Sequence, residues 1–259
     1  MIRIDVYLFS RGFAKSREAA KKSIDAGLVT VDGRKITKPG EKIDENVPHS
    51  IEYSDSVPYV GRGGLKLEAA LDAFSVIPEG KVCIDVGAST GGFTDCLLMR
   101  GAAKVYAVDA GRDQLDSSLR ANPRVLSLEG VNARYLSSEL IPETIDLAVM
   151  DVSFISQTLI LPSLSGLIAE DGIAITLIKP QFECGREALG KGGIIKKPEY
   201  RILAVRLVAS AAESCGFHLI DLIRSPIQGG DGNVEFLGLF SRTPGDPLET
   251  VIGKVNYNS

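Results

Sequence analysis

The sequence predicts an α/β protein, in which a mostly parallel sheet ends in an antiparallel hairpin and a small α+β domain comes first. Two observations predict the sheet. Strand-like and helix-like segments alternate from Leu65 onward, and two strand-like segments near the end of the chain are joined without a helix. Strand–helix alternation indicates parallel strands with helices on both faces. A basic segment with a hairpin signal predicts the small domain.

The length of 259 residues suits one large domain with a small module, and we predict boundaries at 1–58 for the module, 59–64 for a linker and 65–259 for the main domain. A hydrophobic content of 44% supports a substantial core, yet no apolar stretch approaches the roughly 18 residues of a membrane span. The first residues lack the pattern of a secretory signal. We therefore expect a cytoplasmic protein without a membrane partner.

Cysteine and histidine usage gives no sign of a metal centre. The cysteines are widely spaced and form no C-x-x-C pair, which favours reduced thiols in a cytoplasmic protein; they are Cys83, Cys96, Cys184 and Cys215. Two histidines, His49 and His218, are too few for a histidine-based metal site and argue against a Ser-His-Asp triad. We expect no metal.

Charge is unevenly distributed along the chain. Residues 1–42 carry ten Lys/Arg against five Asp/Glu, although the whole chain has a net charge of −4. Such asymmetry indicates an anionic partner for the basic segment. Within this segment we predict a helix over 5–13, a second helix from the N-cap Ser16 to Gly27, and a hairpin over 28–36 that turns at Asp32 and Gly33.

The main domain is predicted to contain seven strands. Five alternate with helices and span residues 82–87, 104–109, 124–129, 145–151 and 173–179. The predicted helices span 92–101, 113–121, 156–169 and 198–216. Two last strands, 217–225 and 233–240, should pair as a hairpin at a sheet edge, because the loop between them contains no helix. Five parallel strands and a terminal antiparallel strand are typical of Rossmann-like S-adenosylmethionine-dependent methyltransferases, whereas dinucleotide-binding folds continue in parallel.

The segment "DVGASTGGFTDCL", residues 85–97, ends the first of these strands and opens a helix. Glycines let the backbone approach a ligand there, and the helix start offers free N–H groups. Asp85 is placed to meet the methionine ammonium of S-adenosylmethionine, and Asp109 to bind ribose hydroxyls in either cofactor class. The spacing is not G-x-G-x-x-G, which weakens a nicotinamide interpretation. A tight turn without a ligand is the alternative.

The ends of the fourth and fifth strands carry Asp151 and Lys179. The segment "DVSF" lacks the prolines of an Asp/Asn-Pro-Pro-aromatic loop that methylates base nitrogens. No Pro-Cys element supports Cys184 as a nucleophile for carbon methylation. An alcohol therefore remains as the acceptor of the methyl group. A ribose 2′-hydroxyl is a poor nucleophile until its proton is removed or polarised. A lysine, with a reference pKa of about 10.4, needs neighbouring groups to set its charge state. Taken alone, Lys179 would be half of a salt bridge with Asp151.

Several long motifs resemble the hemolysin A (TlyA) family of ribosomal RNA 2′-O-methyltransferases, which have an FtsJ-like catalytic domain. They are "YVGRGGLKLEAAL", "CIDVGASTGGFTDCLLMRGAAKVYAVD", "DVSFIS", "IKPQFE", "GKGG" and "PIQGGDGNVEF". The opening module is similar to the RNA-binding fold of a small-subunit ribosomal protein. Two features depart from the family: Gly61 stands where serine is usual, and the segment after Asp109 lacks aromatic residues.

The resemblance implies a Lys-Asp-Lys-Glu tetrad, which falls on Lys66, Asp151, Lys179 and Glu235. Lys179 would act on the 2′-hydroxyl as a general base or a polarising donor. The S-adenosylmethionine site would comprise Asp85, Gly87, Ser89, Thr90, Gly91, Gly92, Phe93, Asp109, Asn132 and Asp151.

The module would bind ribosomal RNA or ribosomal subunits, with cytidine as the expected target. Candidate phosphate contacts are Arg3, Arg11, Lys15, Arg17, Lys21, Lys22, Arg34, Lys35 and Arg62. Three other functions stay open on the residues alone: a nicotinamide-dependent oxidoreductase, a non-catalytic RNA-binding or ribosome-assembly factor, and a base methyltransferase.

Overall fold

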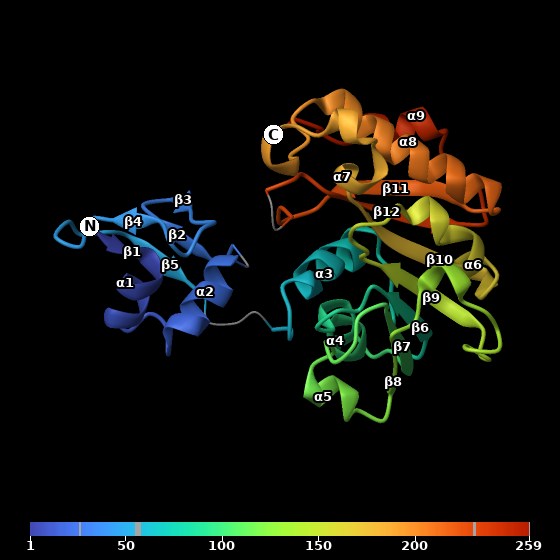
Figure 1. The fold of residues 1–259 in the computed structure, drawn as a ribbon, viewed down its shortest axis with the longest axis horizontal. Helices are drawn as coiled ribbons and strands as arrows, with labels where there is room; N and C mark the ends of the chain where they lie inside the picture. Colours follow the sequence, from blue (N-terminus) through green and yellow to red (C-terminus); the bar gives the residue numbers. More distant parts are fainter. Residues whose placement is uncertain (26, 55–57, 230–231, 259) are drawn as a thin grey trace.

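The computed structural model describes residues 1–25, 27–54, 58–229 and 232–258. It shows a small N-terminal module beside a larger sheet domain (Figure 1). Each part has hydrophobic clusters of its own: residues 2–53 supply one cluster, and two further clusters lie in the sheet domain. The exact boundaries 1–58, 59–64 and 65–259 stay a prediction.

The N-terminal module packs two helices on two small antiparallel sheets. Its elements are β1 (Ile2–Arg3), α1 (Ile4–Ser10), α2 (Arg17–Asp25), β2 (Val29–Val31), β3 (Arg34–Lys35), β4 (Lys42–Ile43) and β5 (Ile51–Tyr53). The predicted cap and hairpin are confirmed: the Ser16 hydroxyl accepts a hydrogen bond from the Ala19 N–H (3.0 Å), and β2 pairs with β3. Asp32 and Gly33 have the positive φ angles of a tight hairpin turn. The first helix ends three residues earlier than predicted.

The larger domain is built on a seven-stranded sheet in the order β11-β12-β10-β9-β6-β7-β8. Its strands are β6 (Val82–Val86), β7 (Lys104–Asp109), β8 (Val125–Glu129), β9 (Ile145–Met150), β10 (Ile168–Ile178), β11 (His218–Arg224) and β12 (Phe236–Ser241). Strand β12 is antiparallel to both neighbours, and the strands from β10 to β8 are mutually parallel. The predicted mostly parallel sheet with a terminal hairpin is therefore confirmed, with β12 inserted one position inside the edge.

Helices cover both faces of this sheet, as Figure 1 shows. They are α3 (Gly63–Ala73), α4 (Gly92–Met99), α5 (Ser117–Arg120), α6 (Leu161–Ser165), α7 (Pro180–Glu183), α8 (Pro198–Ser214) and α9 (Leu248–Gly253), with 3-10 turns η1 (Ala133–Tyr135), η2 (Gln157–Leu159), η3 (Arg186–Ala188) and η4 (Lys191–Gly193). Alternate strand residues serve opposite faces. In β9, Leu147 and Val149 join the cluster with α3 and α4, whereas Ala148 and Met150 join the cluster with α8.

Two predicted helices are wrong in extent. The helix predicted over 156–169 is limited to α6 and η2, because Gly166 follows α6 and Ile168 already pairs with Ile145 as the start of β10. A register shift between Ile168 and Ile173 lets β10 begin five residues before its predicted start. The helix predicted over 113–121 shrinks to α5, where Asp116 caps the helix by accepting from the Ser118 N–H.

The predicted linker lies against the larger domain. Tyr59 is buried in the cluster with α3 and α4, and the Val60 N–H donates to Asp95 Oδ2 in α4 (2.8 Å). Helix α3 already begins at Gly63. Residues 59–64 therefore position α3, and with it Lys66, on the sheet domain. Within the described ranges, no helix is both long and apolar enough to cross a bilayer.

Candidate active site

One edge of the sheet collects the predicted site residues. Gly87, Asp151 and Lys179 follow directly after β6, β9 and β10, and Asp109 ends β7. The carboxyl ends of parallel strands meet at one edge, where open α/β sheets bind ligands. Glu235 comes just before β12, which is antiparallel and pairs Phe236 with Ile178. The residue before β12 is thereby brought beside the residue after β10, so Glu235 reaches the same edge as Lys179.

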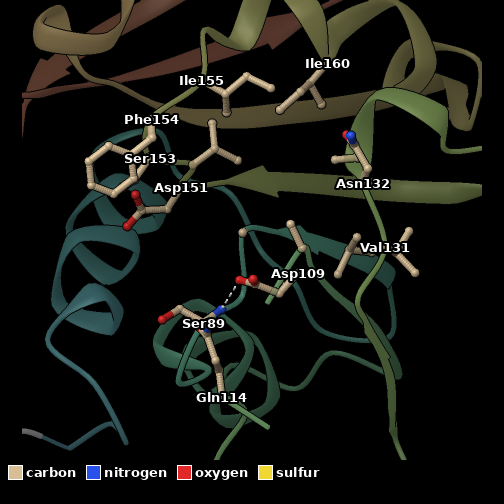
Figure 2. A pocket seen from close by; sticks show the side chains of 15 residues that line it. Ser89, Asp109, Gln114, Val131, Asn132, Asp151, Ser153, Phe154, Ile155 and Ile160 are labelled. Atoms are coloured by element: carbon tan, nitrogen blue, oxygen red, sulfur yellow. Dashed lines mark hydrogen bonds between the residues drawn. The ribbon is translucent and has the colours of Figure 1, made fainter. Parts of the chain in front are cut away.

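The strand-end cavity, of about 410 Å³, opens at this edge (Figure 2). It contains five of the predicted cofactor residues, namely Gly87, Ser89, Asp109, Asn132 and Asp151. Sequence reasoning missed the rest of its lining, which is largely apolar: Val108, Ala110, Gln114, Val131, Ala133, Val152, Ser153, Phe154, Ile155 and Ile160. An apolar wall facing a few polar groups is typical of a site for a nucleoside-sized ligand.

Asp109 is held rigidly at the mouth of the strand-end cavity. Its Oδ2 accepts a hydrogen bond from the Ser89 N–H (2.8 Å), and its Oδ1 accepts one from the Gly111 N–H (2.7 Å); Figure 2 shows the bond to Ser89. A carboxylate has about four acceptor positions, so two remain for a ligand. This arrangement fits the two hydroxyls of a ribose.

The glycine-rich loop is shaped by two different requirements. Gly87 has φ +86°, and a Cβ at this position would lie 2.4 Å from the Asp151 carbonyl oxygen, so only glycine lets β6 and β9 come this close. Gly91 has φ +97° and starts α4, and a Cβ there would lie 2.2 Å from Leu119 Cδ1. Gly91 lines neither cavity at the sheet edge. Glycine is required at position 91 by the turn that starts α4, whereas Gly87 lines both cavities at the sheet edge.

Asp85 lies beneath the loop and lines neither cavity. It is fully buried, and its Oδ2 accepts hydrogen bonds from the Thr94 N–H (2.9 Å) and hydroxyl (2.7 Å). Its Oδ1 has no partner among the described residues. Burial raises the pKa of Asp85 to about 7, and the Thr94 hydrogen bonds oppose this rise. The unpartnered buried oxygen fits an additional donor, such as an ammonium group.

A second, smaller space, the lysine cavity, of about 210 Å³, adjoins the strand-end cavity. Both are lined by Gly87, Ser89, Asp151 and Ser153. Lys179 and the predicted loop residues Thr90, Gly92 and Phe93 line only the lysine cavity. Asp151 therefore stands at the junction between a nucleoside-sized space and the space that contains the lysine.

The four tetrad residues form two ion pairs. Lys179 Nζ lies 2.6 Å from Asp151 Oδ1 and donates to the Ser153 hydroxyl (2.9 Å). Lys66 Nζ donates to Glu235 Oε2 (2.6 Å), and both side chains are almost fully buried. Gln181 Nε2 donates to the other oxygen, Glu235 Oε1 (3.2 Å). Lys66 is therefore a buried lysine: α3 points it into the domain, where the Glu235 carboxylate compensates its charge.

Phe154 is the most conspicuous residue that sequence reasoning passed over. Its side chain is 92% exposed, and its φ of +64° is rare for a large residue. The ring lies 5.2 Å from that of Phe182, measured between centroids. Both phenylalanines line the aromatic cavity, an open depression of about 610 Å³ that also includes Arg134 and Arg186. The signal was available in "DVSF", where Phe154 stands four residues after Met150, the last residue of β9.

The predicted RNA contacts lie on the N-terminal module and just after it. Most are exposed, and several are engaged with carboxylates: Arg3 and Arg17 with Asp5, Lys21 with Glu18, and Arg34 with Glu41. Arg11 lies over the Tyr7 ring, and Lys15 and Lys22 are exposed on or near α2. Lys35 and Arg62 line a shared cavity between the module and the sheet domain. The described side chains include no cluster of His, Cys, Asp and Glu suited to a metal ion.

Comparisons with known proteins identify the family of this chain. Residues 59–242 match the family described as FtsJ-like methyltransferase, and residues 2–47 match the S4 domain. The "Putative rRNA methyltransferase YqxC" of Bacillus subtilis is 45% identical, with 95% of this chain and 88% of the relative covered. The "16S/23S rRNA (cytidine-2'-O)-methyltransferase TlyA" of Mycobacterium tuberculosis is 43% identical, with 94% and 91% covered. This chain belongs to the TlyA family.

The solved structures support the same placement. A "Putative hemolysin from Streptococcus thermophilus" is 41% identical, superposes with a TM-score of 0.74, and covers 98% of this chain and 94% of its own. The resemblance to the TlyA family is therefore confirmed over almost the whole chain, including the S4 domain. TlyA relatives are named as ribosomal RNA 2′-O-methyltransferases, which makes the FtsJ-like domain of this chain the catalytic part.

Proposed function

We propose that this protein transfers the methyl group of S-adenosylmethionine to the ribose 2′-oxygen of a cytidine in ribosomal RNA, acting in the cytoplasm. One observation carries the proposal: Lys179 is held by Asp151 at the junction of a nucleoside-sized cavity and a second space open to a substrate. The names of the TlyA relatives support ribosomal RNA and cytidine as the substrate.

The strand-end cavity would hold the cofactor. Asp109 would accept hydrogen bonds from the ribose hydroxyls, and the apolar side chains of Val131 and Ile160 would contact the adenine. Asp85 lines neither cavity, so its unpartnered oxygen beneath the loop would reach the methionine ammonium only with a shift of the glycine-rich loop. When bound, S-adenosylmethionine supplies an electrophilic methyl group on a positively charged sulfur. The cavity would then direct that group toward the lysine cavity.

Lys179 would orient the acceptor hydroxyl. An ammonium group has three N–H donors, and one of them bonds to the Ser153 hydroxyl. Asp151 Oδ1 pairs with the ammonium charge without a hydrogen bond to it, so donors remain for the ribose 2′-oxygen. The lysine would stabilise negative charge as it develops on that oxygen. The carboxylate of Asp151, the basic group beside Lys179, would take up the hydroxyl proton. Alignment supplies most of the acceleration in this scheme, because no covalent intermediate is required.

Lys66 and Glu235 would shape the site from behind. Neither residue lines the two cavities at the sheet edge, so direct contact with the cofactor is not their role in this scheme. The buried pair ties α3 to the start of β12, and Gln181 extends the tie to α7. The elements that carry Lys179 and its surroundings would thereby be fixed relative to each other.

The RNA would approach over Phe154 and the N-terminal module. An exposed aromatic ring at the rim of a catalytic cavity is suited to stack on an unstacked base. The S4 domain would bind structured RNA through its exposed cations, mainly by phosphate contacts.

The test is methylation of unmodified ribosomal subunits with radiolabelled S-adenosylmethionine, followed by nucleoside digestion and mass analysis. We expect the label in 2′-O-methylcytidine. Label on a base would identify a base methyltransferase. RNA binding without transfer would identify a non-catalytic assembly factor. Binding of a nicotinamide cofactor instead of S-adenosylmethionine in calorimetry would identify an oxidoreductase. Each of these three results would overturn the proposal.

A further inference from the structure

A large cavity, of about 810 Å³, lies between the N-terminal module and the sheet domain, and we call it the interdomain cavity. One wall comes from the end of α2 and from the segment around β3. The other comes from the segment that follows β11. This cavity lies outside the two cavities at the sheet edge, and the proposed catalytic scheme assigns it no role.

The interdomain cavity is strongly basic. Lys35 and Lys38 contribute from the module, Arg62 from the segment before α3, and Arg224 from the end of β11, whereas Asp25 is the carboxylate among the described lining residues. Within the described part of the chain, none of these four cations forms an ion pair. Arg224 donates to the Asn258 carbonyl (2.7 Å) and Arg62 to the Asp25 carbonyl (3.3 Å). Uncompensated cations in a concave wall concentrate positive potential, which favours an anionic ligand.

The interdomain cavity adjoins the catalytic centre at two points. Arg62 lines both this cavity and the lysine cavity that contains Lys179. Gly229 lines its other side and packs against the tetrad, since a Cβ on Gly229 would lie 2.4 Å from Glu235 Oε1. The two spaces therefore meet at Arg62, and a ligand bound in both would contact this residue. An extended polyanion would occupy both the lysine cavity and the interdomain cavity, whereas a compact anion would occupy only one of them.

We propose that the interdomain cavity holds the sugar–phosphate backbone of the RNA strand as it leaves the methylated nucleotide, with Lys38 and Arg224 as phosphate contacts. This inference rests on the proposed function. A nucleotide presented to a recessed catalytic lysine must leave its helix, so the flanking strand is locally single. The cavity then connects the catalytic domain to the RNA bound on the S4 domain. Arg224, on a strand of the sheet domain, makes the catalytic domain itself part of RNA binding.

The test compares two double variants of the full chain. Lys38→Gln with Arg224→Gln removes two cations from the cavity. Arg206→Gln with Lys254→Gln removes the same charge from α8 and from the end of α9, where both cations are exposed and paired with carboxylates. Binding to unmodified ribosomal subunits is measured between about 50 and 200 mM salt, without cofactor. S-adenosylmethionine affinity is measured separately by calorimetry.

We expect the cavity variant to bind subunits more weakly at low salt. The slope of log K against log salt should fall by about 1.4, because each single-strand phosphate contact contributes about 0.7. The control variant should keep the wild-type slope, and both should keep wild-type S-adenosylmethionine affinity and thermal midpoint. Arg224→Lys with Lys38→Arg should restore the slope. A cavity variant that matches the control variant would overturn the inference.

A competition experiment separates a strand from a free anion. A single-stranded oligoribonucleotide should displace the subunit from the wild type more effectively than from the cavity variant, and inorganic phosphate at the same phosphate concentration should displace neither. Equal displacement by inorganic phosphate would overturn the strand assignment. Because these measurements need no methyl transfer, failure of the cavity assignment and failure of the methyltransferase proposal give different results.

Discussion

Lys179 illustrates how one residue depends on its neighbours at the end of a strand. It follows β10 directly and is largely buried, yet its charge is met by Asp151 at 2.6 Å and by the Ser153 hydroxyl. In this setting Asp151 and Ser153 hold the ammonium group of Lys179 away from solvent, in a position where a substrate oxygen can contact it. The salt-bridge and catalytic interpretations of Lys179 are therefore compatible.

Replacing Lys179 tests this role. Lys179→Met should lower methyl transfer by at least about 100-fold, the contribution typical of a positioned acid–base group. S-adenosylmethionine affinity should stay within about threefold, because the lysine lies outside the strand-end cavity. Initial rates on unmodified subunits and calorimetry provide the two readouts. The matched control is Lys254→Met, which breaks an exposed ion pair with Asp246 and should leave both values unchanged. Near wild-type turnover of Lys179→Met would remove the lysine from the mechanism.

Phe154 is the second residue whose environment suggests a role. We expect Phe154→Ala to raise the KM for ribosomal subunits by about 5- to 150-fold, since stacking on one base contributes about 1–3 kcal/mol. Phe154→Tyr, which keeps the ring, should behave nearly as the wild type. Steady-state kinetics at saturating S-adenosylmethionine give the values. An unchanged KM in Phe154→Ala would show that the exposed ring does not contact the RNA.

At the scale of elements, the loop after β9 is fastened to α7. Glu183 accepts hydrogen bonds from the Ser156 hydroxyl (2.5 Å) and the Gln157 N–H (3.0 Å), and Gln157 Nε2 donates to the Leu177 carbonyl (2.6 Å). The loop begins at Asp151 and α7 follows Lys179, so this clamp connects the two segments that carry the Asp151–Lys179 ion pair.

Glu183→Gln should therefore lower kcat by about 3- to 100-fold, as small misplacements of catalytic groups do, and leave S-adenosylmethionine affinity nearly unchanged. Burial raises the pKa of Glu183, so protonation would loosen the clamp at a higher pH than for an ordinary glutamate. The variant should consequently flatten the acid side of the pH–rate profile. Glu187→Gln, on the exposed 3-10 turn that follows, is the control. A Glu183→Gln enzyme with wild-type kcat and an unaltered profile would contradict the clamp.

The N-terminal module contains a pH-sensitive link between two of its loops. Both ring nitrogens of His49 face acceptors: Nδ1 lies 2.7 Å from Asp32 Oδ2, and Nε2 lies 2.9 Å from the Asp44 carbonyl. The Asp32 carboxylate, and next the Asp44 carbonyl, raise the pKa of His49 above its usual value. Only the doubly protonated ring can donate to both acceptors.

Because the folded-state pKa is raised, the stabilisation from His49 is complete below about pH 6.5 and is lost as pH rises through the folded pKa. His49→Gln should therefore lower the thermal midpoint of the module most at about pH 6 and least at about pH 8.5. Scanning calorimetry of both proteins across this range gives the difference. His218→Gln is the control. A difference that stays constant with pH would show that folding does not raise the pKa of His49.

The whole molecule combines a basic opening segment with an acidic remainder. Residues 1–42 have five excess positive charges, so the remainder of the chain has nine excess negative charges. RNA affinity should consequently reside in local patches and depend steeply on salt, despite the negative net charge.

Arg11→Gln with Lys22→Gln tests this at the exposed face of the module. The slope of log K against log salt for subunit binding should decrease by between about 1.4 and 1.8, and kcat at saturating subunits should not change. Arg206→Gln with Lys254→Gln again supplies the control. An unaltered slope would place RNA binding on another surface of the chain.

Local sequence patterns carried most of the fold. The strands were predicted from segments rich in β-branched and apolar residues that alternate with helix-like segments. The hairpin turn was predicted from the Asp32-Gly33 pair. Both signals depend only on residues that are neighbours in the chain. The extents of β10 and of the helix before it were missed. Ile168 becomes a strand residue only by pairing with Ile145, which no local pattern contains.

For the candidate site, local patterns were enough to place particular residue types at the strand ends: Asp109, Asp151 and Lys179 follow apolar segments that are predicted as strands. The tertiary structure decided which of them meet. Lys66 and Glu235 are 169 residues apart, and they pair because β12 inserts beside β10 with Phe236 opposite Ile178, while α3 packs across the same edge. The two kinds of interaction act over different distances along the chain. Periodicity and turn chemistry act between neighbours in the chain, whereas cavities and buried ion pairs depend on strand order and helix packing.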